Sequence, residues 1–229
     1  MKILIPTIGS RGDVQPFIAL TLALSSAGHT VRLASHPGMG GLVKALQPLS
    51  ERPMLRHVIE RVTSQVAALA LSVERPCKTF NAFGLPQLAD AKPDGGPLVG
   101  LLSGLQWMDT AYDWLLLAPC DAPFIPLDLS ERLFECAAGS GHAGALVRYS
   151  GEVQPTFSLW HRSILPTLEQ AVNVEGMAGF KQFLRVADLA ELEWPQSTPP
   201  PFFNINDQDA LQKAQRMMNR SKEDSACSA

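Results

Sequence analysis

Short apolar runs alternate with longer amphipathic stretches along most of the chain. The runs are typical of β-strands, and the stretches between them carry apolar residues at helical spacing. Strands are predicted at residues 2–7, 30–34, 67–71, 85–88, 114–117, 145–149, 156–160 and 202–206. Helices are predicted from Pro16 toward Gly28, at 53–66, 97–111, 127–138, 164–172 and 177–188, and after Asp207. This alternation favours an α/β fold with a mostly parallel sheet and right-handed crossovers.

The stretch from Trp114 to Phe124 is the centre of the predicted sheet. Its first four residues are apolar without alternation, as in a strand that is covered on both faces. Asp121 follows, and Pro123 ends any further regular pairing. Open α/β sheets bind ligands at the carboxyl ends of their strands, where a carboxylate suits Mg²⁺ together with substrate phosphates. The alternative is that Asp121 only caps the next turn or helix.

The composition narrows the class of protein. The chain has 229 residues, a formal net charge of −3 and a pI near 5.9, so it has no basic field for nucleic acid or an anionic membrane. Its four cysteines are scattered without a C-x-x-C pair, which fits a reducing cytosol. The early apolar run at 17–24 is too short to span a bilayer. We therefore expect a soluble cytoplasmic protein with no nucleic-acid or membrane partner.

A glycine-rich stretch with a nearby lysine is a candidate phosphate site. Gly38, Gly40 and Gly41 would let backbone N–H groups approach phosphate oxygens, and Lys44 adds a mobile positive charge. The spacing of a Walker A motif is absent. The alternative is a plain glycine-rich turn.

Two further polar groups are candidate ligand contacts. Asp90 and Asp94 precede the glycine pair and proline of 95–97, which would expose N–H groups at the start of a helix, or form an ordinary solvent turn. Asn204 and Asn206 alternate on one face of a predicted short strand. Their amides would either contact a ligand or satisfy backbone groups at the strand end.

Taken in order, these groups resemble a known family. From about residue 38 to 218 the chain resembles the molybdenum cofactor guanylyltransferases, and the ordered set is far more specific than any single motif. The resemblance implies a three-layer Rossmann-like nucleotidyltransferase fold. The matching segments are Met39-Gly-Gly-x-x-Lys44, Arg52-Pro-Met-Leu55, Phe83-Gly-Leu-Pro86, Asp90-x-x-Pro-Asp94, Gly96-Pro-Leu-x-Gly-Leu101, Pro119-Cys-Asp-x-Pro-Phe124 and Phe203-Asn-Ile-Asn206.

The resemblance also implies a reaction, in which the terminal phosphate of molybdopterin attacks the α-phosphorus of GTP and pyrophosphate leaves. Charge builds up on the non-bridging oxygens, so Mg²⁺ and a lysine must face it. By position, Asp121 matches the family's metal-binding aspartate and Lys44 its phosphate-facing lysine, which makes these two the expected catalytic residues. Asp90 matches an aspartate that contacts the nucleotide. Asn204 and Asn206 match an asparagine pair on the cofactor side.

The chain departs from the family pattern in the nucleotide loop. Where the family has Leu-Ala-Gly-Gly, this chain has Ser35 and His36 after Leu-Ala, and their side chains would obstruct close backbone approach to the guanine. Val43 replaces an aspartate, and Ser72 stands where the family has a nucleotide-contacting asparagine. The resemblance implies these nucleotide-binding positions: Leu33, Ala34, Ser35, Gly40, Gly41, Lys44, Ser72, Asp90 and Asp121.

The front of the chain is different in character. Residues 1–17 and 27–37 resemble the start of sterol-type glycosyltransferases, a match that covers only about one β-α-β unit. We therefore expect a chimera, with an appended strand and helix at 1–29, a nucleotidyltransferase-like domain at 30–218 and a disordered tail at 219–229.

Three hypotheses about function follow. The first is transfer of GMP from GTP to molybdopterin with Mg²⁺, with a molybdoenzyme or a cofactor-insertion protein as a possible partner. The second is an inactive or impaired chimera that retains the fold and binds without turnover. The third is a glycosyltransferase fragment, which nothing after residue 37 supports.

Overall fold

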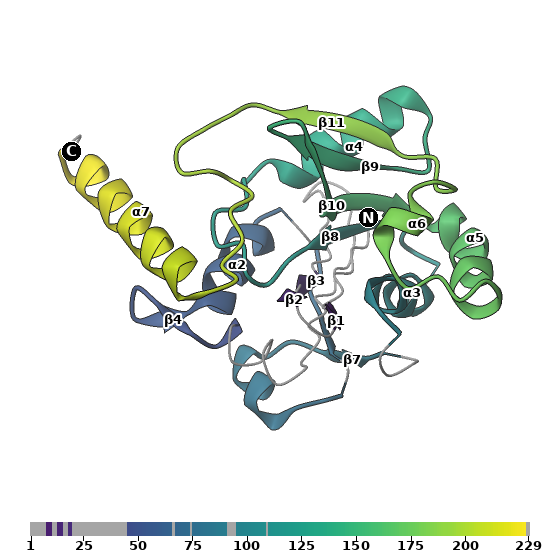
Figure 1. Cartoon of the computed structure of the whole chain (residues 1–229), viewed down its shortest axis with the longest axis horizontal. Helices are drawn as coiled ribbons and strands as arrows, with labels where there is room; N and C mark the ends of the chain where they lie inside the picture. The colour runs from purple at the N-terminus through teal and green to yellow at the C-terminus, as the bar shows by residue number, and fades with distance from the viewer. Residues whose placement is uncertain are drawn as a thin grey trace.

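The computed structural model describes most of the chain after residue 44 (Figure 1). Side chains are described from residue 45 to 220. The strands predicted at 2–7 and 30–34 lie outside the described residues, so those two predictions stay predictions. The described ranges are 8–10, 13–15, 18–19, 45–65, 67–73, 75–90, 95–108 and 110–227.

The largest sheet has five strands in the order β11-β9-β10-β8-β3. β10 pairs antiparallel with both β8 and β9, and β11 pairs parallel with β9, so β8, β9 and β11 run in one direction. β3 pairs antiparallel with β8. The strands are β3 (Ile18–Ala19), β8 (Trp114–Ala118), β9 (Gly144–Tyr149), β10 (Glu152–His161) and β11 (Ala190–Trp194).

The sheet is therefore mixed, whereas the sequence pattern predicted a mostly parallel one. The reason lies in the turn between β9 and β10, where Ser150 and Gly151 adopt positive φ angles of 52° and 80°. A two-residue turn of this kind can join only antiparallel strands. The long β10 is thereby inserted against the direction of its two neighbours.

The remaining strands form three two-stranded sheets. Two are antiparallel, β1 (Ile8–Ser10) with β2 (Asp13–Gln15) and β4 (Pro48–Leu49) with β5 (Arg52–Pro53). The third is parallel, β6 (Leu71–Val73) with β7 (Gln87–Ala89). The described helices are α2 (Met54–Thr63), η1 (Lys78–Phe83), α3 (Pro97–Trp107), α4 (Leu129–Ser140), η2 (Arg162–Ile164), α5 (Leu165–Glu169), η3 (Gln170–Val174), α6 (Phe180–Phe183) and α7 (Gln208–Cys227).

Helices cover both faces of the large sheet. On β10, the Trp160 ring stacks on Phe180 and Phe183, and both of these phenylalanines belong to α6. Its neighbour His161 is paired with Trp114 of β8, whose ring packs edge-on against Phe134 of α4. Because successive strand residues point to opposite faces, α6 and α4 lie on opposite sides of the sheet. The three-layer α/β fold class is confirmed.

The central strand β8 is as buried as its sequence predicted. Leu115, Leu116, Leu117 and Ala118 are all fully buried. The apolar stripe of α2 is also confirmed, since Val58 and its apolar neighbours on that face are buried. Among the helices of the described residues, none combines the length and the apolar character that crossing a bilayer requires.

Several predicted elements differ from the structure. Ile18 and Ala19, placed in a helix from the sequence, form β3 and pair with β8. Residues 202–206 make no strand, although Phe202 is held by ring contacts to Tyr149, Phe157 and Trp194. The strand β11 was not among the strands predicted from the sequence.

The last helix is the clearest difference from a predicted tail. Asp207 begins α7 as expected, with its Oδ1 accepting a hydrogen bond from the Ala210 N–H at 2.8 Å. The helix then runs to Cys227 and extends away from the body of the molecule (Figure 1), where a disordered tail was expected from residue 219. The division at residue 29 lies outside the described residues and stays a prediction.

Gly96 is the glycine whose replacement should be most damaging. It has a φ of 75° at the start of α3, and a Cβ there would lie 2.5 Å from the Ala178 carbonyl oxygen. Gly96→Ala is expected to lower the free energy of unfolding by roughly 2–4 kcal/mol, measured by urea denaturation. Gly179→Ala is the matched control, since its Cβ would meet no atom within 4 Å. Equal stability of the two variants would contradict the prediction.

Candidate active site

Asp121 occupies the position that the sequence predicted, in the loop after the carboxyl end of β8. The residue is fully buried. It does not cap the next helix, because α4 begins after Asp128. A buried carboxylate at this edge of the sheet lies where α/β proteins bind ligands, and it is too far from α4 to cap that helix.

One backbone hydrogen bond brings the asparagine pair to Asp121. The Ile205 N–H donates to the carbonyl oxygen of Asp121 at 2.8 Å, so Asn204 and Asn206 flank the residue that is joined to the aspartate. The Ile205 side chain packs with Phe124 and other residues in a small apolar cluster. The fold thus places the segment that carries Asn204 and Asn206 beside the backbone of Asp121.

The side-chain oxygens of the two asparagines have no hydrogen-bond donor in the described structure. Within the described part of the chain, Oδ1 of Asn204 and Oδ1 of Asn206 are buried and accept no hydrogen bond. Buried polar atoms left unpaired in a folded protein point to a ligand, a water or an ion. A ligand contact at these two oxygens stays a prediction, as does the alternative that the amide groups satisfy backbone groups.

A second polar pair lies on the β6-β7 sheet. Ser72 is fully buried in β6, and its Oγ donates to Oδ1 of Asp90 at 3.0 Å. The Asp90 N–H donates to the Val73 carbonyl at 2.9 Å, which fixes the start of the loop after β7. β3 contacts both β6 and β8, so the two sheets are bridged. The structure thus places the two predicted nucleotide residues, Ser72 and Asp90, in direct contact.

Two N–H groups at the start of α3 are used within the protein. The Leu98 N–H donates to the Ala178 carbonyl at 3.3 Å, and the Val99 N–H donates to the Gly96 carbonyl at 3.2 Å. These two groups are therefore not open to an anion, and a ligand contact at the glycine pair of 95–96 stays a prediction. Gly96 is required by the close approach of the segment around Ala178.

The rest of the predicted site lies outside the described residues. The six predicted positions before residue 45 are Leu33, Ala34, Ser35, Gly40, Gly41 and Lys44. The pairing of Lys44 with Asp121 therefore stays a prediction. Within the described ranges, no cluster of three or more His, Cys, Asp or Glu side chains could hold a metal.

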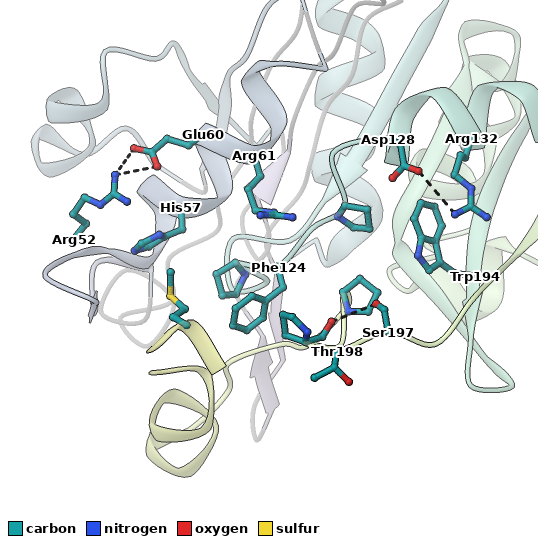
Figure 2. Close-up of a pocket in the computed structure, with 15 residues that line it drawn as sticks. Arg52, His57, Glu60, Arg61, Phe124, Asp128, Arg132, Trp194, Ser197 and Thr198 are labelled. Atoms are coloured by element: carbon teal, nitrogen blue, oxygen red, sulfur yellow. Dashed lines mark hydrogen bonds and ion pairs between the residues drawn. The ribbon is translucent and has the colours of Figure 1, made fainter. Parts of the chain in front are cut away.

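Sequence reasoning missed a large cavity in the described structure. A cavity of about 800 Å³ lies beside the loop after β8, between α2, α4 and the proline-rich segment before Phe202 (Figure 2). Arg61 of α2 points into this cavity. It lies three residues after the buried Val58, so the helical spacing could have shown that Arg61 is on the buried side of α2. None of the predicted site residues that the structure describes lines this cavity.

Comparison with known proteins agrees with this geometry. Residues 32–192 match the family described as the MobA-like NTP transferase domain. A molybdenum cofactor guanylyltransferase of Rhodopseudomonas palustris is 34% identical over 187 residues, covering 80% of this chain and 89% of the relative. One from Cupriavidus pinatubonensis is 36% identical over 179 residues, covering 76% of this chain and 87% of the relative.

A solved structure supports the fold. The molybdopterin-guanine dinucleotide biosynthesis protein A from Archaeoglobus fulgidus has a TM-score of 0.69 and 16% identity to this chain. The match covers 96% of this chain and all of that one. The nucleotidyltransferase-like fold expected from the sequence is confirmed.

The unpaired asparagine oxygens lead to a prediction about stability. Asn206→Ala is expected to leave the free energy of unfolding unchanged or to raise it by up to about 1 kcal/mol, because a buried acceptor without a partner is itself destabilising. Gln65→Ala is the control, since Gln65 bonds Arg61, Pro126 and Ser130. The control should lose about 2 kcal/mol or more in urea denaturation. A comparable loss in Asn206→Ala would contradict the prediction.

Proposed function

The chain belongs to the MobA-like NTP transferase family, and on that premise we propose that it transfers GMP from GTP to the terminal phosphate of molybdopterin. A phosphate oxygen of the acceptor forms a bond to the α-phosphorus of GTP. The bond between the α-phosphorus and the bridging oxygen breaks, and pyrophosphate leaves with that oxygen. The chain is thus a nucleotidyltransferase of molybdenum cofactor biosynthesis.

The observation that carries this proposal is the contact between Ile205 and Asp121. It brings together a buried carboxylate and two unpaired amide oxygens at the edge of the sheet. In the proposed site, Asn204 and Asn206 hold the acceptor by accepting hydrogen bonds from it. Their fixed position orients the acceptor phosphate for attack, which lowers the entropic part of the barrier.

Mg²⁺ suits the donors on this side of the site. Asp121 offers carboxylate oxygens and the two asparagines offer amide oxygens, and Mg²⁺ is commonly held by one or two carboxylates plus substrate phosphates. We assign the ion to Asp121. When bound, the ion would stabilise the negative charge on the phosphate oxygens.

Asp90 and Ser72 form the proposed nucleotide side. The Ser72 hydroxyl bonds Oδ1 of Asp90 and thereby fixes the orientation of the carboxylate. Ser72 reaches less far than the asparagine found in the family, so in this chain it acts on the nucleotide through Asp90. We extend the proposal to Lys44, facing the phosphates, and to the segment 33–41 as the nucleotide loop.

The altered loop supports a second candidate, a protein that retains the fold but has impaired GTP binding. Ser35 and His36 stand where two glycines would allow close approach of the base. The family match begins at residue 32, so it leaves the glycosyltransferase-like segment 1–29 without a counterpart. The glycosyltransferase-like origin of that segment stays a prediction. So do a cytoplasmic location and a molybdoenzyme or cofactor-insertion partner.

Replacement of Asp121 tests the enzyme proposal. Asp121→Asn is expected to lower kcat/KM for GMP transfer from GTP to molybdopterin by about 100-fold or more, because it removes the negative charge that holds the metal. Binding of GTP measured by calorimetry should lose its dependence on Mg²⁺. Asp113→Asn is the matched control, since Asp113 directly precedes β8 at the strand's other end. An Asp121→Asn variant with the activity of the control would overturn the assignment.

Restoring glycine in the loop distinguishes the two candidates. The double variant Ser35→Gly, His36→Gly is expected to bind GTP about tenfold more tightly, because the backbone can then approach the base. Calorimetric titration with GTP and Mg²⁺ measures the change. Ser150→Gly in the β9-β10 turn is the control and should not alter affinity. If the original chain already binds GTP strongly and the loop variant binds it no better, Ser35 and His36 are tolerated and the impaired-site candidate fails.

A further inference from the structure

The cavity beside the β8-α4 loop holds an arginine with an unusual environment. Arg61 projects from α2 into the cavity, and its Nε donates to the Ile125 carbonyl (Figure 2). Burial lowers the pKa of its guanidinium from the usual value. Among the described residues, no carboxylate lies within ion-pair distance of Arg61. A half-buried guanidinium without a counter-ion favours an anionic ligand.

The acidic side chains on the cavity wall are not available to Arg61. Glu60 accepts hydrogen bonds from Nη1 of Arg52 at 2.7 and 3.0 Å, and Figure 2 shows it directed toward that residue. Oδ2 of Asp128 lies 4.0 Å from Nη1 of Arg132. The wall therefore keeps an uncompensated positive charge on Arg61.

A second cation is held in place on the same cavity. The Arg132 guanidinium lies 3.9 Å from the centre of the Trp194 ring, a cation–π contact that fixes its position. Arg132 remains about one-third exposed, so it can still donate to a ligand. Two guanidinium groups on the wall of one cavity favour an anionic ligand there.

Hydrogen bonds hold the wall around Arg61 in place, and part of this wall is apolar. Nε2 of Gln65 donates to the carbonyls of Arg61 and Pro126 at 3.0 and 2.7 Å, and its Oε1 accepts from the Ser130 N–H at 3.1 Å. These bonds fix the loop against α2. Phe124 and several prolines supply apolar surface, and about 800 Å³ is far more room than inorganic phosphate needs. The space fits an anion that carries an organic body.

We propose that this cavity is a second ligand site, in which Arg61 binds the phosphate group of a small organic phosphate monoester and the Arg132 guanidinium adds positive charge to the cavity wall. The site does not include Asp121, Asp90 or the asparagine pair, so this proposal does not rest on the proposed function. The organic body of the ligand packs against Phe124 and the prolines of the wall.

Phenyl phosphate is a suitable probe, because it combines a phosphate with a flat apolar ring. In calorimetric titrations of the full chain without Mg²⁺ or nucleotide, we expect one phenyl phosphate to bind. Arg61→Gln should weaken this binding by about tenfold or more, since a charged hydrogen-bond donor is lost. Arg56→Gln is the matched control on the same helix, because Arg56 lies over Phe83 outside the cavity. It should bind as the unmodified chain does.

Further variants make the test decisive. Arg132→Gln, which leaves α2 intact, should weaken binding as well, so the result does not depend on one variant folding. Asp121→Asn should leave phenyl phosphate affinity unchanged, which separates this site from the transfer site. Benzoate should bind at least about tenfold more weakly than phenyl phosphate. The proposal is overturned by absence of binding, by equal affinity for benzoate, or by full affinity in folded Arg61→Gln and Arg132→Gln.

Discussion

The hydrogen bond from the Ile205 N–H to the Asp121 carbonyl joins the two parts of the chain on which the site depends. Asp121 stands at the end of a strand whose four preceding apolar residues are fully buried, so its position is set by the core. Ile205 is anchored independently, through Phe124, Leu49 and Met54. With both ends fixed by packing, a single backbone bond is enough to bring Asn204 and Asn206 to the carboxylate. Polar groups in the site can therefore remain unpaired without loosening the fold.

Much of the central architecture could be predicted because it is encoded locally. The uninterrupted apolar run of β8, the stripe of α2 and the Asp207 cap of α7 each depend on neighbouring residues alone. The direction of β10 depended on the turn at Ser150 and Gly151, a short signal that the strand pattern outweighed. The missed strand β11 is stabilised by pairing with β9, which no local pattern reveals.

For the candidate site, individual residues could be predicted from the sequence, but their contacts could not. The order of motifs identified Asp121, Asn204 and Asn206 as candidates, which no single motif did, but the hydrogen bond from Ile205 to Asp121 was not predicted. The Ser72–Asp90 hydrogen bond was not foreseen, since the two residues lie on separate strands brought together by β6-β7 pairing. The Arg61 cavity was missed for a similar reason. Its wall comes from α2, the β8-α4 loop, α4, β11 and α7, and only tertiary packing brings these together.

The loop after β8 separates two chemically different surroundings. Asp121 near its start is joined through Ile205 to residues whose unpaired oxygens suit a cation, whereas Phe124 a few residues later borders a cavity whose guanidinium groups suit an anion. Gln65 holds the second half of this loop by its bonds to Pro126 and Ser130, and Ile205 holds the first half. Because both halves are held rigidly, a ligand on Arg61 can bind without displacing Asp121. The two surroundings can therefore act as separate sites on one loop.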